Sequence, residues 1–216
     1  MAAHTDAKPP LLEAHYLPTV QYCSHLAKTE VAYLEARENF QKSTYRNRCV
    51  IAGANGPLTL SIPLASGKNE QMPIREVRIS TDTDWNRRHW QAIRSAYGRS
   101  PYFEFYADEL APLYERPATF LFDWNRQLTQ FLIESFRLPV ELRLTEEFHP
   151  LGAETFDDLR GVIHPKPHRI RRPDDFTARP YTQVFSERFG FQSNLSALDL
   201  LCCLGPEAAR VLVAGN

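Results

Sequence analysis

The sequence lacks the features of a membrane-spanning or disulfide-stabilised protein. Its longest apolar runs, such as 200–204, are far shorter than the roughly 20 residues that cross a bilayer as a helix. The chain does not open with a basic stretch followed by an apolar one, so we expect no secretory signal. Only four cysteines are present and none forms a Cys-x-x-Cys pair, which favours reduced thiols and a cytoplasmic location.

The short motifs that identify common catalytic and cofactor sites are also absent. There is no glycine-rich dinucleotide or phosphate loop, no Gly-x-Ser-x-Gly and no His-Glu-x-x-His. His164 and His168 have a spacing seen in metal sites, but the two prolines between them prevent the helix that would align their imidazoles. We therefore predict no metal site, and the sequence names no cofactor.

What the chain does contain is enough apolar material for a core. Its 216 residues are 43% hydrophobic and 12% aromatic, so it can fold without disulfides or metals. Residues 1–10 are polar and end in two prolines, and we expect them to form a flexible tail. Residues 11–216 are then predicted to form a single globular domain.

Hydrophobic periodicity predicts a mixed α+β fold, in which short strands with an antiparallel hairpin segment pack against several helices. The predicted strands are 11–14, 31–36, 48–51, 58–63, 74–79 and 140–145. The predicted helices are 19–28, 85–97, one that starts at 100–101 and is bent or ended by Pro112, 119–136, one that ends at 204, and one from 207. Residues 148–180 read as a long irregular loop, and long ordered loops are often functional.

Charge is unevenly distributed along the chain although the net charge is only −1. Three windows, 39–69, 85–103 and 159–173, contain lysine and arginine but no aspartate or glutamate. If two of these windows meet in the fold, they form an anion-binding site; if they scatter, they are ordinary solvated surfaces.

The loop 39–48 within the first window is rich in hydrogen-bond donors. It offers Lys42, Arg46, Asn47 and Arg48 without any carboxylate, which is the inventory needed to hold a phosphate, a carboxylate or a sugar. The alternative interpretation is a polar turn whose asparagines bond to their own backbone.

Two histidines are candidates for proton transfer. His89 lies at the edge of the apolar face of the helix predicted over 85–97, and its unperturbed pKa of ~6.5 suits a general base. The alternative is a core-edge histidine bonded to a carbonyl. His15 lies in the turn after the first predicted strand, where ligands commonly bind in α/β layouts.

Short motifs follow one another in a fixed order from about residue 11 to about residue 212. They are Tyr16-Leu-Pro18 with Tyr22, Phe40-Gln-Lys42, Tyr45-Arg-Asn-Arg48, Gly56 with Leu58 to Pro63, Trp85 with His89, Ala96-Tyr-Gly98, Pro101-Tyr-Phe103, Tyr181 to Phe185, Gly190-Phe191, and Asn194-Leu-Ser-x-x-Asp199. In order and spacing they resemble the WbqC-like family of bacterial proteins.

The resemblance implies a cytosolic protein associated with the building of surface polysaccharides. Transfer of a small acyl or aminoacyl group to an activated sugar is the reaction type suggested by that association, and glycosyl transfer is the other group transfer that we consider. Many members of the family begin with His-Gln-Pro-x-Tyr, and the position of that histidine is Leu12 here. A catalytic role for that histidine therefore does not carry over to this chain.

The leading hypothesis is an enzyme of surface glycoconjugate biosynthesis acting on a small anionic substrate, such as a nucleotide sugar or acyl donor. Its candidate catalytic residues are His89 and His15, and its candidate substrate-binding residues are Tyr16, Lys42, Arg46, Asn47, Arg48, Arg94 and Tyr97. The alternative is a non-catalytic binding or assembly protein that forms an oligomer. Nucleic-acid binding is disfavoured by the net charge of −1.

Overall fold

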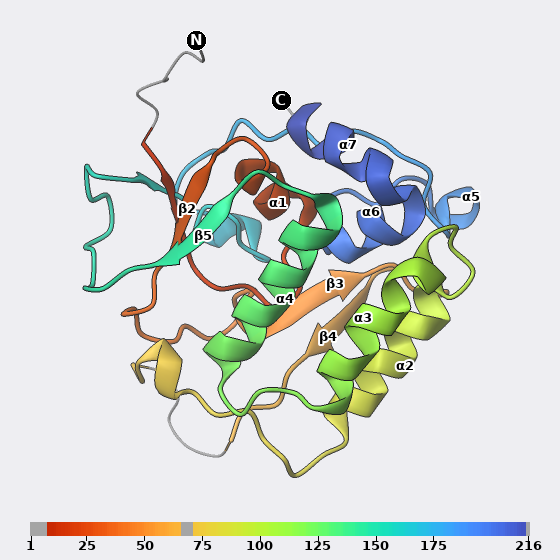
Figure 1. Cartoon of the computed structure of the whole chain (residues 1–216), viewed down its shortest axis with the longest axis horizontal. Coiled ribbons are helices and arrows are strands. Elements are labelled where there is room, and N and C mark those ends of the chain that lie inside the picture. Colours follow the sequence, from red (N-terminus) through yellow and green to blue (C-terminus); the bar gives the residue numbers. More distant parts are fainter. Residues whose placement is uncertain (1–7, 66–70, 215–216) are drawn as a thin grey trace.

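A parallel sheet and a separate antiparallel hairpin form the β structure of the protein (Figure 1). The structure is a computed structural model and describes residues 8–65 and 71–214. The parallel sheet has the order β5-β2-β1-β6, with β1 at Pro10–Leu12, β2 at Val31–Leu34, β5 at Glu141–Leu144 and β6 at Asp157–Asp158. The hairpin pairs β3 (Arg48–Ile51) with β4 (Leu58–Ser61).

Helices surround both β elements (Figure 1). They are α1 (Val20–Leu26), α2 (Trp85–Tyr97), α3 (Phe103–Glu115), α4 (Leu121–Phe136), α5 (Ser186–Phe189), α6 (Ala197–Leu204) and α7 (Ala208–Ala214), with 3-10 turns η1 (Ile74–Glu76), η2 (Pro167–Arg169) and η3 (Gly205–Glu207). The predicted mixed α+β class, with an antiparallel hairpin segment among helices, is confirmed. Within the described residues, no helix has the length and apolarity to span a membrane.

Local sequence signals explain most of the helix boundaries. The Thr19 hydroxyl accepts the Tyr22 N–H at the start of α1, and the Ser196 hydroxyl accepts the Leu198 N–H at the start of α6. Helix α4 ends at Arg137, whose φ of 53° is left-handed. Buried residues of α4 recur at helical spacing, as the periodicity predicts, and α4 contributes Trp124 to the apolar core.

Two predicted elements differ in the structure. Residues 74–79 are not one strand: the Val77 N–H bonds to the Ile74 carbonyl and closes η1, so the first two buried side chains, Ile74 and Val77, are three residues apart. Of the two predicted effects of Pro112, ending the helix does not occur: α3 continues to Glu115, because Tyr114 is buried and holds the last turn. The predicted tail over 1–10 lies mainly outside the described residues, while Pro10 begins β1.

The parallel sheet determines where its loops meet. Leu11 pairs with Tyr33 on one side and with Asp158 on the other, and Tyr33 pairs with Arg143. Because all four strands run in the same direction, the loops that follow them leave from one edge of the sheet. Strand β6 was not predicted, because its two residues are both aspartates and carry no apolar pattern.

Helix α4 ties two of these loops together through one side chain. Asn125 is fully buried, and its Nδ2 donates to the Ala14 carbonyl at 3.1 Å and to the Arg46 carbonyl at 2.7 Å. Ala14 lies in the loop after β1, and Arg46 lies in the segment between β2 and β3. The amide therefore fixes the relative position of the two loops.

We predict that Asn125→Leu lowers the free energy of unfolding by about 2–4 kcal/mol, because it leaves two buried carbonyls without a donor. Urea unfolding followed by circular dichroism measures the change. Gln127→Leu is the matched control, since Gln127 is exposed on the same helix and should shift stability by less than about 0.5 kcal/mol. Equal effects of the two substitutions would contradict the assignment of Asn125 as a clamp.

Candidate functional site

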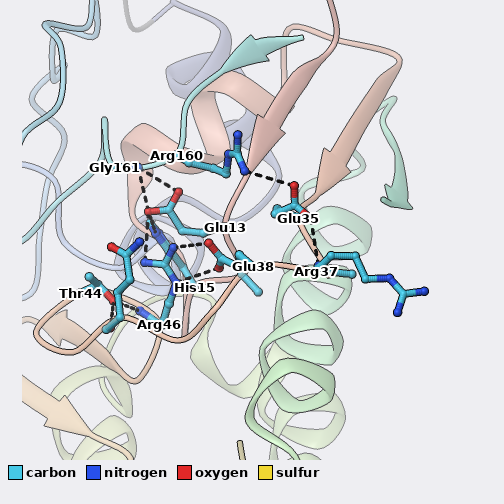
Figure 2. Close-up of polar contacts among 12 residues, drawn as sticks. Glu13, His15, Glu35, Arg37, Glu38, Thr44, Arg46, Arg160 and Gly161 are labelled. Carbon is cyan, nitrogen blue, oxygen red and sulfur yellow. Dashed lines mark hydrogen bonds and ion pairs between the residues drawn. The ribbon is translucent and has the colours of Figure 1, made fainter. Parts of the chain in front are cut away.

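A network of buried charges lies at the edge of the parallel sheet where its strands end (Figure 2). Glu13 and Glu35 are the first residues after β1 and β2, and Asp158 is the last residue of β6. Each charged residue of the network is at most 5% exposed. The members of this ion network are Glu13, Glu35, Glu38, Arg46, Asp158 and Arg160.

One half of the ion network is centred on Arg160. Its guanidinium contacts Glu35 Oε2 at 3.2 Å and Asp158 Oδ2 at 2.9 Å, and it also donates to the His149 carbonyl at 2.8 Å. The other oxygen of Glu35 accepts the Thr145 hydroxyl at 2.7 Å. Loops that follow β2, β5 and β6 are thus joined by charge-assisted hydrogen bonds.

The other half is centred on Arg46. Its guanidinium forms a two-point pair with Glu38, at 2.8 Å to Oε1 and 2.5 Å to Oε2, and lies 3.7 Å from Glu13. Glu13 also accepts the Gly161 N–H at 3.2 Å to each oxygen, where Gly161 has a φ of 70° that favours glycine. His15 Nε2 lies 3.3 Å from Glu13 without hydrogen-bond alignment, and His15 Nδ1 has no partner among the described residues.

The two carboxylates beside Arg46 differ in acidity. Burial by itself raises the pKa of Glu13, but Arg46, His15 and the Gly161 N–H outweigh it and bring that pKa down to about 2. Burial raises the pKa of Glu38, with Arg46 opposing the rise. Environments that separate the pKa values of neighbouring carboxyl groups are typical of acid–base sites, and structural ion pairs also produce them.

A cavity of about 710 Å³ borders the ion network, and we call it the sheet-edge cavity. Its cationic wall consists of Lys42, Arg46, Arg160, Arg169 and Arg171, and its apolar wall includes Phe40, Phe148 and Leu151. Glu38 is the one acidic residue among the described residues that line it. The first and third acid-free windows therefore meet here, although residues 66–69 of the first lie outside the described residues.

A second cavity of about 370 Å³ lies between the loop 40–48 and the end of the β3–β4 hairpin, and we call it the hairpin cavity. It shares Phe40 and Lys42 with the sheet-edge cavity. Asn47 and Arg48 supply its other polar groups together with Ser43, and 62–64 supply its apolar wall. The predicted binding residues Lys42, Asn47 and Arg48 are brought together in this cavity.

Of the other predicted residues, Arg46 lines the sheet-edge cavity, and the remaining five line neither cavity. Tyr16 and His89 are buried against each other, with the Tyr16 hydroxyl 2.8 Å from His89 Nδ1, and burial lowers the pKa of His89 to about 4. Tyr97 is fully buried and its hydroxyl accepts the Ala52 N–H. Arg94 is exposed on α2. His15 is buried beside Glu13, and burial lowers the pKa of His15.

Several residues of the site were not singled out from the sequence. Glu13, Glu35, Glu38 and Asp158 lie outside the three acid-free windows, and Arg160 is one of five basic residues in the third window. A charged residue near the end of a predicted apolar strand, as Glu13 is in 11–14, is the signal that finds it, since carboxyl ends of parallel strands meet at one edge. His164 was considered only as a metal ligand, and it lines the sheet-edge cavity.

The fold and site define a mixed α+β protein with a basic cavity beside a buried ion network at one edge of a parallel sheet. The chain belongs to the WbqC-like protein family, whose model matches residues 13–163. That range contains every member of the ion network. The chain is also similar to the uncharacterized protein Rv1507c of Mycobacterium tuberculosis, with 27% identity over 226 residues that cover 94% of this chain and 96% of the relative. No solved structure matches.

We predict that stability falls in acid because of Glu13. A carboxyl whose pKa is lowered from 4.5 to about 2 by folding stabilises the protein above pH 4.5, and this contribution is lost as pH falls towards 2. Urea unfolding at pH 7, 4.5 and 3 should show a smaller pH dependence for Glu13→Gln than for the wild type. The exposed Glu104→Gln serves as the control and should keep the wild-type slope. An unchanged slope in Glu13→Gln would refute the assignment.

Proposed function

We propose that this WbqC-like protein is an enzyme that binds a small anionic substrate in the sheet-edge cavity and transfers a group from it. The observation that carries the proposal is the wall of this cavity, where the buried carboxyl group of Glu38 lies among several cations. Cations suit the binding of an anion, and a buried carboxyl with a raised pKa suits proton transfer.

The cationic residues of the cavity wall divide into those whose charge is paired within the protein and those whose charge is available to a ligand. Arg46 and Arg160 are paired with buried carboxylates and have little charge left to offer. Arg171 donates to the backbone carbonyls of Asp158 and Arg160. Arg169 is exposed and has no ion pair to any other described residue, so it is the cation best placed to meet an anionic ligand.

The size and the apolar wall of the cavity favour a substrate with both a charged and an apolar part. A volume of about 710 Å³ falls in the range of roughly 300–1,000 Å³ typical of small-molecule sites. Phe148, which is exposed, offers aromatic surface for stacking on a base or packing on an acyl chain. A nucleotide sugar or an acyl donor meets these requirements, as the sequence-based hypothesis expects.

Proton transfer is assigned to Glu38, with His164 as the second titratable group of the cavity. The two-point pair with Arg46 holds the Glu38 carboxyl in one orientation. Burial lowers the pKa of His164, so this imidazole is neutral at pH 7. His15 acts through Glu13 as a positioning residue in this proposal, and His89 packs in the core with Tyr16.

The biological setting that we propose is surface glycoconjugate biosynthesis. It is supported by the family, which is associated with surface polysaccharides, and by the chemistry of nucleotide sugars, whose diphosphate requires the cations of the cavity.

We expect at least one of UDP-glucose, acetyl-coenzyme A and ATP to raise the melting temperature. A ligand present at 100 times its Kd adds about 2.7 kcal/mol to stability. Arg169→Ala should weaken the binding of that ligand about 5- to 10-fold by calorimetry, and Arg94→Ala, which removes an exposed arginine outside both cavities, should leave it unchanged. No response to any of the three compounds would count against the proposal.

We further predict that Glu38→Gln lowers kcat by about 100-fold or more while the Kd for the substrate changes much less, because the amide lacks the transferable proton and keeps one oxygen acceptor for Arg46. Release of UDP or coenzyme A measures turnover, and calorimetry measures Kd. Thermal unfolding checks that the variant folds, with Glu38→Asp as the carboxyl-retaining control. Binding without turnover in the wild-type protein would instead support the non-catalytic alternative.

A further inference from the structure

We infer that the sheet-edge cavity binds an acyl phosphate, free or as part of an acyl nucleotide, whose aliphatic chain packs on two exposed apolar side chains. These side chains are Phe148 and Leu151, which line the cavity and are 55% and 62% exposed, and we call them the apolar rim. This substrate class rests on the proposed function and narrows it to one of the two kinds of substrate named there, the acyl donor.

Large exposed apolar side chains concentrate at this cavity. Among the described residues six such side chains are exposed, and the two of the apolar rim line the cavity. A third, Ile170, lies in the chain between Arg169 and Arg171, which both line the cavity as well. Single exposed apolar residues are ordinary, but a group of them beside a cavity is typical of a surface that a ligand or partner covers.

The loop 148–152 that carries the apolar rim is fastened to the ion network by its backbone. The N–H groups of His149 and Gly152 donate to carboxylates of the network, at 3.1 and 2.8 Å. Arg160 donates to the carbonyls of His149 and Pro150, at 2.8 and 3.1 Å. Because these bonds fix the loop, its apolar side chains cannot turn inward without the loss of charge-assisted hydrogen bonds.

The same hydrogen bonds determine which ligand group suits the apolar rim. They use both polar backbone groups of His149, the Pro150 carbonyl and the Gly152 N–H within the protein, and proline has no N–H. A base edge or a sugar needs partners for its own polar groups, and few backbone partners remain here. An aliphatic chain needs none and gains free energy by covering apolar surface. The apolar rim therefore favours an aliphatic chain over a base or a sugar.

The charged part of the ligand is determined by Arg169. This residue lines the same cavity as the apolar rim, and it has no ion pair to any other described residue. A guanidinium suits the oxygen atoms of a phosphate. Because one cavity of about 710 Å³ contains both features, the phosphate and the chain belong to one ligand and lie a few bonds apart. An acyl phosphate has this arrangement, whereas a nucleotide sugar has no aliphatic chain.

A membrane surface would be another way to cover apolar side chains beside arginines. The loop of the apolar rim is flanked by Glu147 and Glu154, which are both exposed. Carboxylates at these positions would lie against anionic headgroups and be repelled by them. A small ligand that enters the cavity avoids this repulsion, so we assign the apolar rim to a ligand and not to a lipid surface.

Calorimetric titration with methyl, butyl and hexyl phosphate tests the substrate class. We expect the Kd to fall at least 10-fold from methyl to hexyl phosphate, because each buried methylene adds to binding. Arg169→Ala should weaken the binding of all three by about 5- to 10-fold. The hexyl ester of AMP, compared with hexyl phosphate, distinguishes an acyl nucleotide from a free acyl phosphate by whether the adenosine strengthens binding.

Variants of the apolar rim separate the chain from the phosphate. Phe148→Ser and Leu151→Ser should each remove at least 3-fold of the gain from chain length and leave the Kd of methyl phosphate unchanged. Phe105→Ser is the matched control, because Phe105 is exposed on α3 and does not line the cavity. The substituted side chains are exposed in all three variants, and circular dichroism confirms that the variants fold.

Equal binding of the three alkyl phosphates, still weakened by Arg169→Ala, would overturn the acyl phosphate and leave the proposed function intact. A gain from chain length that persists in both rim variants would overturn it too. Sedimentation with phosphatidylglycerol vesicles that Phe148→Ser abolishes, without any gain from chain length, would assign the rim to a membrane instead. No binding of alkyl phosphates or of UDP-glucose would reject the substrate class and the proposed function together. Chain-dependent binding without turnover would reject only the enzymatic function.

Discussion

A carboxylate removed from water is costly unless donors or cations meet its oxygens, and this protein buries four of them at one edge of a sheet. The compensation comes from Arg46 and Arg160, which are supplied by segments far apart in the sequence. Loss of either guanidinium would leave buried negative charge without its partner. The loops that follow β1, β2 and β6 must therefore pack against one another cooperatively. This requirement holds the site in one arrangement.

The same constraint separates structural charge from charge that a ligand can use. The charges of Arg46 and Arg160 are neutralised by buried carboxylates in the ion network. Their side chains are therefore held in place and form a rigid part of the wall of the sheet-edge cavity. Arg169 at the rim and Arg48 beside the hairpin have no such partners among the described residues. A fixed wall with unpaired donors beside it is a preorganised arrangement, because little side-chain order remains to be gained on binding.

Local patterns predicted the helices and the hairpin better than they predicted the sheet. The apolar spacing of α4 and the Asn-Gly turn between β3 and β4 are both formed by residues close in sequence. Strand β6 is two aspartates long and exists only because β1 lies beside it. The segment 74–79 alternates like a strand, yet it has no neighbouring strand to pair with over its length and closes into a turn.

The sequence by itself determined the fold class, the family and the concentration of basic residues in the loop 39–48, since composition, motif order and periodicity are local properties. Only the tertiary structure decided which cations are free, because a charge is neutralised by partners that are far away in the chain. Arg46 and Arg48 are two residues apart and were assigned the same role. One is buried against Glu38 and the other keeps an unpaired nitrogen, and the difference arises from the folded neighbours of each side chain.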